Sequence, residues 1–235
     1  MGNIALMNEL NRAVILAAGK GTRLKSLTQD KPKALMSIAG EPAIVHVIRQ
    51  LVGQGIHDIA INIHHHAEQI RQVLGNGSSF NANLYYSFEP ELLNSGGGVR
   101  TAIQLLPQGG AIAVHNADIM TNIQLQSLAK LCPKQGCALA LVPNPRHNAK
   151  GDFSLNNQHV TIADSNPLTF AGVSVWAEDA LLTYPCHESF PLTQPIRALI
   201  EQQQCHGSIY RGQWFDIGRH RDLIQANRLF KAEDL

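Results

Sequence analysis

Short apolar runs alternate along the chain with helical apolar patterns, and this alternation predicts the fold class. A short continuous apolar run is typical of a buried strand, whereas apolar residues three and four positions apart are typical of a helix with one buried face. The runs predict strands over residues 13–16, 59–63, 84–88, 111–115 and 138–142. The spaced patterns predict helices over residues 43–52, 68–74, 99–106 and 123–131. This alternating order favours an α/β fold with a mostly parallel sheet covered by helices on both faces.

The pattern changes in the later part of the chain. It predicts short strands over residues 152–155 and 160–163, a longer strand over 169–176, a helix over 196–203, a strand-like segment over 208–217 and a closing helix over 221–230. No segment is rich enough in Pro, Gly or Ser to separate two folding units. We therefore expect an N-terminal extension over residues 1–12 and a single domain over residues 13–235. Its later half should extend the same sheet and form one wall of a cleft.

Composition and charge narrow the class of protein. A chain of 235 residues that is 44% hydrophobic fits one soluble globular domain. A net charge of +1 provides no basic field for nucleic acid or for an anionic membrane, so neither is expected as a partner. No long apolar stretch follows a basic start, and the four cysteines form no CxxC pair. We therefore expect a cytoplasmic protein with reduced thiols, while its oligomeric state stays open.

The segment after the first predicted strand carries the most chemical information. It reads Leu16-Ala17-Ala18-Gly19-Lys20-Gly21-Thr22-Arg23-Leu24. A glycine-rich turn at the C-terminal edge of such a sheet exposes backbone N–H groups where α/β folds bind ligands, and glycine allows close approach of phosphate. Lys20 and Arg23 add positive charge beside these amides. Taken alone, the residues leave open a plain strand-to-helix turn with two solvated cations.

Two other phosphate-binding loops do not fit this segment. A dinucleotide fingerprint requires a third glycine where Leu24 stands and an acid at the end of the second strand, which reads Asn62-Ile63-His64 instead. A P-loop requires Ser or Thr directly after Gly-Lys, where this chain has Gly21.

The same segment, followed by Pro32-Lys33, resembles the signature of sugar-phosphate nucleotidyltransferases. Asn116-Ala117-Asp118 and Trp214-Phe215-Asp216-Ile217-Gly218 extend the resemblance over about residues 13–230. Within the family, the chain is most similar to the short N-acetylmuramate 1-phosphate uridylyltransferases of peptidoglycan recycling. That similarity rests on Ser95-Gly96-Gly97-Gly98, Asn144-Pro145, Gly151-Asp152-Phe153 and Thr169-Phe170-Ala171-Gly172-Val173-Ser174. The resemblance implies the nucleotide-diphospho-sugar transferase fold, a Rossmann-like three-layer sandwich with a mixed central sheet.

The resemblance also implies catalytic roles for two cations and a metal. It assigns Arg23 to the β- and γ-phosphates and Lys33 to the α-phosphate. A sugar 1-phosphate is largely dianionic near neutral pH, since its second pKa lies near ~6, and it therefore needs no general base. Catalysis then depends on positioning and on cationic stabilisation. The implied cofactor is Mg²⁺ at Asp118 and Asp216, because Mg²⁺ is usually bound by one or two carboxylates together with substrate phosphates.

The remaining site residues are assigned by resemblance to the nucleotide and the sugar. The implied nucleotide-binding residues are Ala18, Gly19, Gly21, Thr22, Arg23, Lys33, Ser95, Gly96 and Asn116. Asp152 and Gly172 are implied to bind the sugar. Two positions depart from the family pattern: Ala117 stands where glycine is usual, and Asn94 stands where the closest relatives carry an acid.

The expected reaction transfers a uridylyl group from UTP to N-acetylmuramic acid 1-phosphate and releases pyrophosphate. One alternative is a guanylyl- or other nucleotidyltransferase for mannose, heptose or glucose 1-phosphate. Another is a catalytically silent protein that binds a nucleotide sugar. A nucleotide-sugar-dependent glycosyltransferase would be expected to carry an Asp-x-Asp motif where this chain has Asn116-Ala117-Asp118.

Histidines at two places resemble functional groups but are given structural interpretations. Adjacent side chains of a strand point to opposite faces, so His64-His65-His66 is expected to begin a helix rather than to bind a metal. His115 is expected to be a hydrogen-bonded core residue rather than a catalyst.

Overall fold

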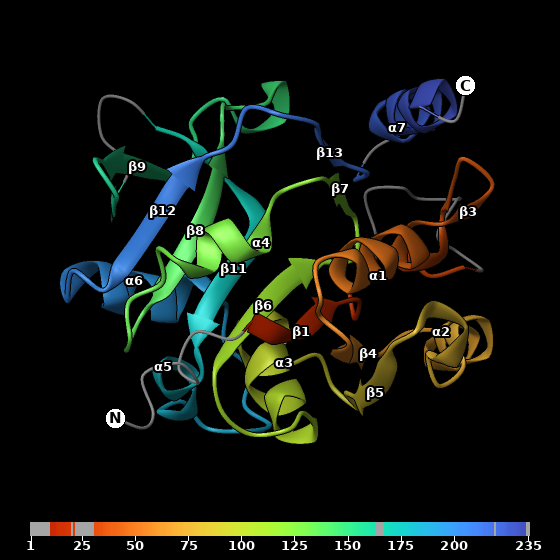
Figure 1. The fold of residues 1–235 in the computed structure, drawn as a ribbon, viewed down its shortest axis with the longest axis horizontal. Helices are drawn as coiled ribbons and strands as arrows, with labels where there is room; N and C mark the ends of the chain where they lie inside the picture. The colour runs from red at the N-terminus through yellow and green to blue at the C-terminus, as the bar shows by residue number, and fades with distance from the viewer. Residues whose placement is uncertain (1–9, 20, 22–30, 163–166, 219, 234–235) are drawn as a thin grey trace.

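A nine-stranded mixed sheet forms the centre of the protein (Figure 1). The structure is a computed structural model that describes residues 10–19, 21, 31–162, 167–218 and 220–233. The strand order is β5-β4-β1-β6-β11-β8-β12-β10-β9. The strands are β1 (Leu10–Leu16), β4 (Asp58–Ile63), β5 (Asn83–Phe88), β6 (Ala111–Asn116), β8 (Cys137–Val142), β9 (Phe153–Asn156), β10 (His159–Ile162), β11 (Thr169–Ala177) and β12 (Cys205–Ile209).

The direction of the strands changes at β11. Strands β5, β4, β1 and β6 are parallel to their neighbours in the first half of the sheet. Strand β11 lies between β6 and β8 and is antiparallel to both. The predicted mixed sheet and its extension by the later half of the chain are therefore confirmed. The insertion of β11 between two strands that precede it in the sequence was not predicted.

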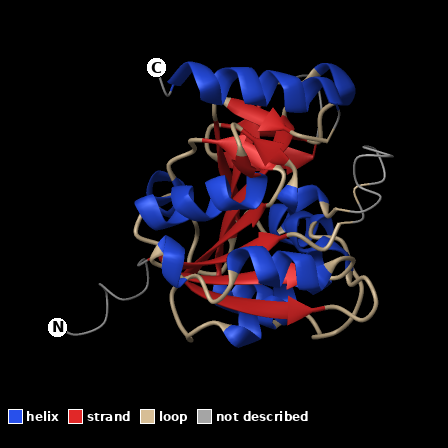
Figure 2. Cartoon of the chain, turned by 90° about the vertical axis from the view of Figure 1, so that its right-hand side faces the viewer, coloured by secondary structure: helices blue, strands red, loops and turns tan. Residues whose placement is uncertain are grey.

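Helices cover both faces of the sheet, which gives the three expected layers (Figure 2). One face packs against α1 (Ala43–Gly53), α2 (Ala67–Leu74) and α4 (Leu125–Ala129), and the other against α3 (Asn94–Ala102), α5 (Glu178–Leu182) and α6 (Thr193–Glu201). Side chains of β1 alternate between the two layers, because successive residues of a strand point to opposite faces. Ala13 and Ile15 join the first core, whereas Val14 joins the second.

Further small elements connect the strands and helices of the central sheet. They are the sheets β2 (Ser37–Ile38) with β3 (Glu41–Pro42) and β7 (Ile119–Thr121) with β13 (Trp214–Asp216), the helix α7 (His220–Glu233), and the 3-10 helices η3 (Lys33–Leu35), η4 (Ser78–Phe80), η5 (Ile103–Leu105) and η6 (Arg146–Asn148). Ala226 of α7 packs with Ile38 and Ile217 in a separate small core. Asn227 accepts a hydrogen bond from Ala39 N at 2.9 Å and donates one to Ser37 O at 3.2 Å. Helix α7 therefore holds the β2–β3 hairpin, which directly follows η3 and Lys33.

The first strand begins at Leu10, three residues before the predicted start. Arg12 interrupts the apolar pattern, and its side chain is nevertheless buried. Its guanidinium lies 3.4 Å from the Glu178 carboxylate and donates a hydrogen bond to Pro107 O. A buried cation is tolerated because it is paired and hydrogen-bonded. The strand therefore includes the last residues of the segment that was predicted to be an extension.

Helix α3 begins at Asn94 and includes the run Gly96-Gly97-Gly98, although the predicted helix began at Val99. Glycine disfavours helices in isolation, so tertiary packing must explain this difference. A Cβ on Gly97 would lie 2.0 Å from Glu188 O, and one on Gly96 would lie 2.4 Å from the Phe190 ring. The segment from Glu188 to Phe190 thus packs directly against the helix backbone.

The predicted strand over residues 208–217 divides into two elements. Strand β12 ends at Ile209 and belongs to the central sheet, whereas β13 begins at Trp214 and pairs with β7. This division brings Asp216 to the neighbourhood of Asp118, as described below.

None of the helices that the structure describes is both long and apolar enough to cross a membrane. All four cysteines are free thiols.

Candidate active site

Asp118 and Asp216 come from distant parts of the sequence and are held together by the β7–β13 pair. Asp118 lies between β6 and β7, and Asp216 ends β13. Asp216 pairs in register with Ile119, and Ile217 N donates a hydrogen bond of 3.0 Å to Asp118 O. The two carboxylates therefore have fixed backbone positions at the C-terminal edge of the parallel strands, where α/β folds bind ligands.

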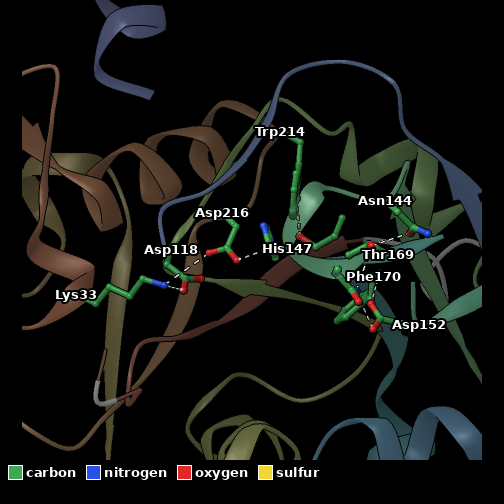
Figure 3. A network of polar contacts seen from close by, with 11 residues as sticks. Lys33, Asp118, Asn144, His147, Asp152, Thr169, Phe170, Trp214 and Asp216 are labelled. Carbon is green, nitrogen blue, oxygen red and sulfur yellow. Dashed lines mark hydrogen bonds and ion pairs between the residues drawn. The ribbon is translucent and has the colours of Figure 1, made fainter. Parts of the chain in front are cut away.

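Lys33 points at both carboxylates (Figure 3). Its Nζ atom donates a hydrogen bond to Asp118 Oδ2 and lies 3.6 Å from Asp216 Oδ1. The lysine side chain is 11% exposed, and those of Asp118 and Asp216 are 25% and 17% exposed. His147 Nε2 lies 3.6 Å from the other oxygen of Asp216. Partial burial of these charges makes their interactions stronger than those of an ordinary surface pair.

The carboxylates fit the requirements of a magnesium site. Asp216 Oδ1 is buried and has no hydrogen-bond partner among the described residues. A buried carboxylate oxygen without a donor is costly unless a cation compensates it, and here Lys33 Nζ lies 3.6 Å from this atom. Groups of three or more His, Cys, Asp or Glu that could hold a metal by themselves do not occur in the described part of the chain. Two carboxylates are nevertheless sufficient for Mg²⁺, which takes its other ligands from water and substrate phosphates.

A pocket of about 360 Å³ lies between the loop after β1 and the start of α3. Of the predicted nucleotide-binding residues, Ala18, Gly19, Ser95 and Asn116 line it. Asp118 also lines it, so that the pocket reaches one member of the carboxylate pair. Lys20, Thr22 and Arg23 lie outside the described residues. Gly21 has a φ of +62°, which is the left-handed conformation that glycine adopts without strain.

The amide groups of the first loop residues are directed differently from the expectation. Ala17 N and Ala18 N donate hydrogen bonds of 2.7 Å and 3.3 Å to Asn62 Oδ1. These two amides therefore bind the side chain of the neighbouring strand. Ala18 faces the pocket without a free N–H group to offer to phosphate.

Ser95 and Gly96 are partly engaged by the protein itself. Ser95 Oγ accepts a hydrogen bond of 2.9 Å from Leu192 N, and its residue still lines the pocket. Gly96 N donates to Phe190 O at 2.9 Å. The Gly96 amide is thus occupied by the neighbouring segment.

A second pocket, of about 360 Å³, lies on the other side of Asn116 and Asp118. It is lined by Asp152, Gly172, His147, Trp214 and Asp216, among others. Asp152 Oδ2 accepts a hydrogen bond of 2.9 Å from Phe170 N, and its Oδ1 accepts one of 3.0 Å from Asn148. Each carboxylate oxygen of Asp152 therefore keeps room for a further donor, such as a sugar hydroxyl.

Gly172 allows Asn116 to enter the space between the two pockets. Its φ is +74°, and a Cβ at this position would lie 2.6 Å from Asn116 Nδ2. The pairing of β11 with β8 shifts in register between Phe170 and Ser174, around this residue. Glycine is needed here both for the backbone conformation and for the close approach of the asparagine.

The chain matches the model of the nucleotidyl transferase family over residues 12–151. It belongs to this family. It is 34% identical over 94% of its length to N-acetylmuramate alpha-1-phosphate uridylyltransferase of Neisseria meningitidis serogroup B, of which the match covers 99%. It is 25% identical to a mannose-1-phosphate guanyltransferase of Gibberella zeae, of which it spans 64%. The solved structure of HddC from Yersinia pseudotuberculosis, complexed with GMP-PN, has the same fold, with a TM-score of 0.77 at 20% identity over 94% of this chain and 100% of that one.

The protein is thus a nucleotidyltransferase, and its family acts on sugar phosphates. The family match favours a nucleotidyltransferase over the glycosyltransferase alternative. It also agrees with the α/β architecture and with the motifs on which the predicted resemblance was based.

The two histidine features of this nucleotidyltransferase lie in different surroundings. His115 is fully buried, and its Nδ1 lies 2.8 Å from Asn116 O. Burial lowers the pKa of His115 to about 4, because the charged imidazolium would lose its hydration. His66 directly precedes α2, which begins at Ala67, and His64 Nδ1 lies 2.7 Å from Glu89 O, so the tract forms the turn before the helix.

Residues that line the two pockets without having been predicted as site residues include Asn62, Glu89, His147 and Trp214. Asn62 stands at the end of a predicted strand, and this position could have indicated a role at the ligand edge. Trp214 is held by a hydrogen bond of 2.9 Å from its Nε1 to Ala171 O. The positions of Glu89 and His147 depend on loops whose course has no signature in the sequence.

Proposed function

We propose that the protein transfers a uridylyl group from UTP to N-acetylmuramic acid 1-phosphate, with Mg²⁺, to give UDP-N-acetylmuramic acid and pyrophosphate. The observation that supports this most directly is that two pockets meet at Asn116 and Asp118, beside Lys33. A nucleotide in the first pocket and a sugar phosphate in the second would bring their phosphates together at that point. Proximity of this kind supplies much of the catalysis in phosphoryl-type transfer.

The proposed reaction needs no general base. An oxygen of the sugar phosphate, already ionised near neutral pH, attacks the α-phosphorus of UTP; the bond to the β-phosphate oxygen breaks, and pyrophosphate leaves with its electron pair. Lys33 would stabilise the charge that builds on the α-phosphate. Asp118 and Asp216 would hold Mg²⁺, whose contribution is to neutralise phosphate oxygens and to orient them. Arg23 would bind the β- and γ-phosphates in two parallel hydrogen bonds, as guanidinium groups do.

Specificity for N-acetylmuramic acid requires a group that binds its lactyl carboxylate. Arg146 and Lys150 precede Asp152 in the sequence, and the two differ in position. Arg146 lines a cavity of about 440 Å³ that shares His147, Trp214 and Asp216 with the sugar pocket, and Arg221 of α7 lines it too. Lys150 is exposed and lines neither cavity. Arg146 is therefore the better candidate, because an arginine can bind a carboxylate through two hydrogen bonds.

The relative from Neisseria meningitidis, at 34% identity over nearly the full length of both chains, supports the choice of UTP and of N-acetylmuramic acid. The relative from Gibberella zeae is a mannose-1-phosphate guanyltransferase and supports the second candidate, guanylyl transfer to a hexose 1-phosphate. Its lower identity and partial coverage make it the weaker argument.

A matrix of substrates tests the proposal. The four ribonucleoside triphosphates and dTTP are each combined with the 1-phosphates of N-acetylmuramic acid, N-acetylglucosamine, glucose and mannose, and pyrophosphate release is followed. We expect the highest kcat/KM for UTP with N-acetylmuramic acid 1-phosphate. A higher value for GTP with mannose 1-phosphate would establish the second candidate, and equal values for both amino sugars would refute specificity for muramic acid. Omission of Mg²⁺ should abolish release in every combination.

A further inference from the structure

Asn62 is a buried polar residue that joins the end of β4 to the loop after β1. The residue is 3% exposed, and its Oδ1 accepts the hydrogen bonds of Ala17 N and Ala18 N. Because Leu16 pairs in register with Asn62, the loop leaves β1 directly beside this side chain. Asn62 thus determines where the loop turns away from the sheet.

Glu89 continues this link to the opposite wall of the first pocket. It follows β5 and is 1% exposed. Its Oε1 accepts a hydrogen bond of 2.8 Å from Asn62 Nδ2, and its Oε2 accepts one of 3.0 Å from Leu93 N, the residue before α3. Gly98 of α3 packs against both side chains, because a Cβ there would lie 2.5 Å from Asn62 Nδ2 and 2.7 Å from Glu89 Oε1.

Burial of a carboxylate with neutral donors alone is unfavourable for stability. No ion pair of Glu89 occurs among the described residues, and the buried Gly98 of α3 lies directly beside it. A pair of well-packed apolar residues would avoid the cost of removing this charge from water. The hydrogen bonds that Asn62 and Glu89 accept, and the one that Asn62 donates to Glu89, instead impose one geometry on two segments, because the donors and acceptors must match in position.

We propose that Asn62 and Glu89 are positioning residues for nucleotide binding, which hold the phosphate-binding loop and the start of α3 at the separation that the nucleotide requires. This inference rests on the proposed location of the nucleotide in the first pocket, which Ala18, Gly19 and Ser95 line. Each residue affects nucleotide binding indirectly, through backbone amides: Asn62 binds those of Ala17 and Ala18, and Glu89 binds that of Leu93. Gly19, which follows Ala18, and Asn94 and Ser95, which follow Leu93, line the pocket from its two sides.

Exchange of the amide of Asn62 and the carboxylate of Glu89 tests whether the hydrogen bond between them supports nucleotide binding. Asn62→Asp places two carboxylates opposite each other, and Glu89→Gln places two amide groups with donors opposite each other. In the double variant, the new carboxylate at position 62 still accepts hydrogen bonds from the loop amides. The new amide at position 89 donates to that carboxylate through its nitrogen and accepts from Leu93 N through its oxygen. All hydrogen bonds are then restored, and only the one between positions 62 and 89 has its donor and acceptor exchanged, in side chains of almost unchanged shape.

The measurement is the equilibrium affinity for UTP and for GTP without sugar phosphate, so that the choice of base and sugar does not decide the result. For the triphosphate that the wild type binds, we expect each single variant to bind at least ~10-fold more weakly and the double variant to recover to within ~3-fold. The KM for the sugar phosphate should change much less than the KM for the nucleotide. Glu178→Gln is the matched control, because it disturbs the Arg12–Glu178 pair at the other end of β1 without changing nucleotide affinity.

Wild-type affinity in both single variants would show that the pair supports the fold alone and would overturn the proposal. A double variant that binds no better than the single ones would overturn it as well. Should Asn62→Asp not fold, Glu89→Gln carries the test by itself, and an unchanged affinity in that variant is the contrary result. Preference of the wild type for GTP would refute UTP as the substrate and would leave this inference intact.

Discussion

Asp118 and Asp216 face a common point because β7 and β13 pair beside them, and the ammonium group of Lys33 contacts both carboxylates. The lysine neutralises part of their charge. A divalent cation that binds there would replace this contact with a stronger one and would free Lys33 to approach a phosphate. The arrangement explains why a buried oxygen of Asp216 tolerates the lack of a hydrogen bond from the described residues.

Substitution of either carboxylate tests the proposed metal site. Asp118→Asn and Asp216→Asn retain the shape of the side chain and remove its charge, so we expect turnover to fall at least ~100-fold while the fold is retained. Pyrophosphate release is measured over a titration of Mg²⁺, and circular dichroism checks the fold. Asp179→Asn, at an exposed position of α5, is the control. Wild-type rates and Mg²⁺ dependence in either active-site variant would refute the assignment.

The predicted role of Arg23 depends on the geometry of its guanidinium and not on its charge alone. Arg23→Lys retains the charge but loses the planar pair of donors. We expect kcat to fall at least ~10-fold, by comparison with the larger losses that follow removal of a preorganised donor. Steady-state kinetics at saturating substrate measure this. Unchanged kinetics would mean that Arg23 does not contact the phosphates.

We expect Arg146, and not Lys150, to bind the lactyl carboxylate of N-acetylmuramic acid. A lost charged hydrogen bond typically costs about 1.5–3 kcal/mol, so the wild type should prefer N-acetylmuramic acid 1-phosphate over N-acetylglucosamine 1-phosphate by roughly 10- to 200-fold. Arg146→Gln should lower this ratio of kcat/KM values, mainly through the muramic acid substrate. Lys150→Gln is the matched control and should leave the ratio unchanged. The reverse result would assign recognition of the lactyl group to Lys150.

The buried, neutral state of His115 should make the stability of the protein depend on pH. Burial lowers its pKa from 6.5 to about 4, so the unfolded chain binds a proton at this residue more readily than the native protein does. Its contribution to stability is therefore fully present above pH 6.5 and is lost as the pH falls toward 4. That difference in pKa corresponds to on the order of 3 kcal/mol.

Urea denaturation between about pH 3.5 and pH 7.5 measures this contribution, because the range spans the two pKa values. His115→Gln has no charge to bury, so its free energy of unfolding should fall less steeply with decreasing pH than that of the wild type. Equal slopes for the two proteins would contradict a neutral His115 in the native state.

The sequence by itself determined the class of fold, the family and the chemistry of the expected site. Local patterns are sufficient for these, because the buried run of β1, the glycines after it and the stripe of α1 each depend on residues close together in the chain. The same patterns placed Asp118 at the ligand edge, since it directly follows a parallel strand. They also indicated that Asp216 needs a partner, because a carboxylate among apolar residues is costly alone.

Tertiary structure alone decided which distant residues meet. The insertion of β11 between β6 and β8, the pairing of β13 with β7 and the packing of Gly97 against Glu188 all depend on contacts between remote segments. The same holds for Asn62 and Glu89, whose polar groups are separated from their partners by other strands and loops. A single sequence shows which residues can form hydrogen bonds, but the partner of each depends on how the whole chain packs. Each segment loses conformational entropy when it is ordered, and only the contacts of the complete fold compensate this loss.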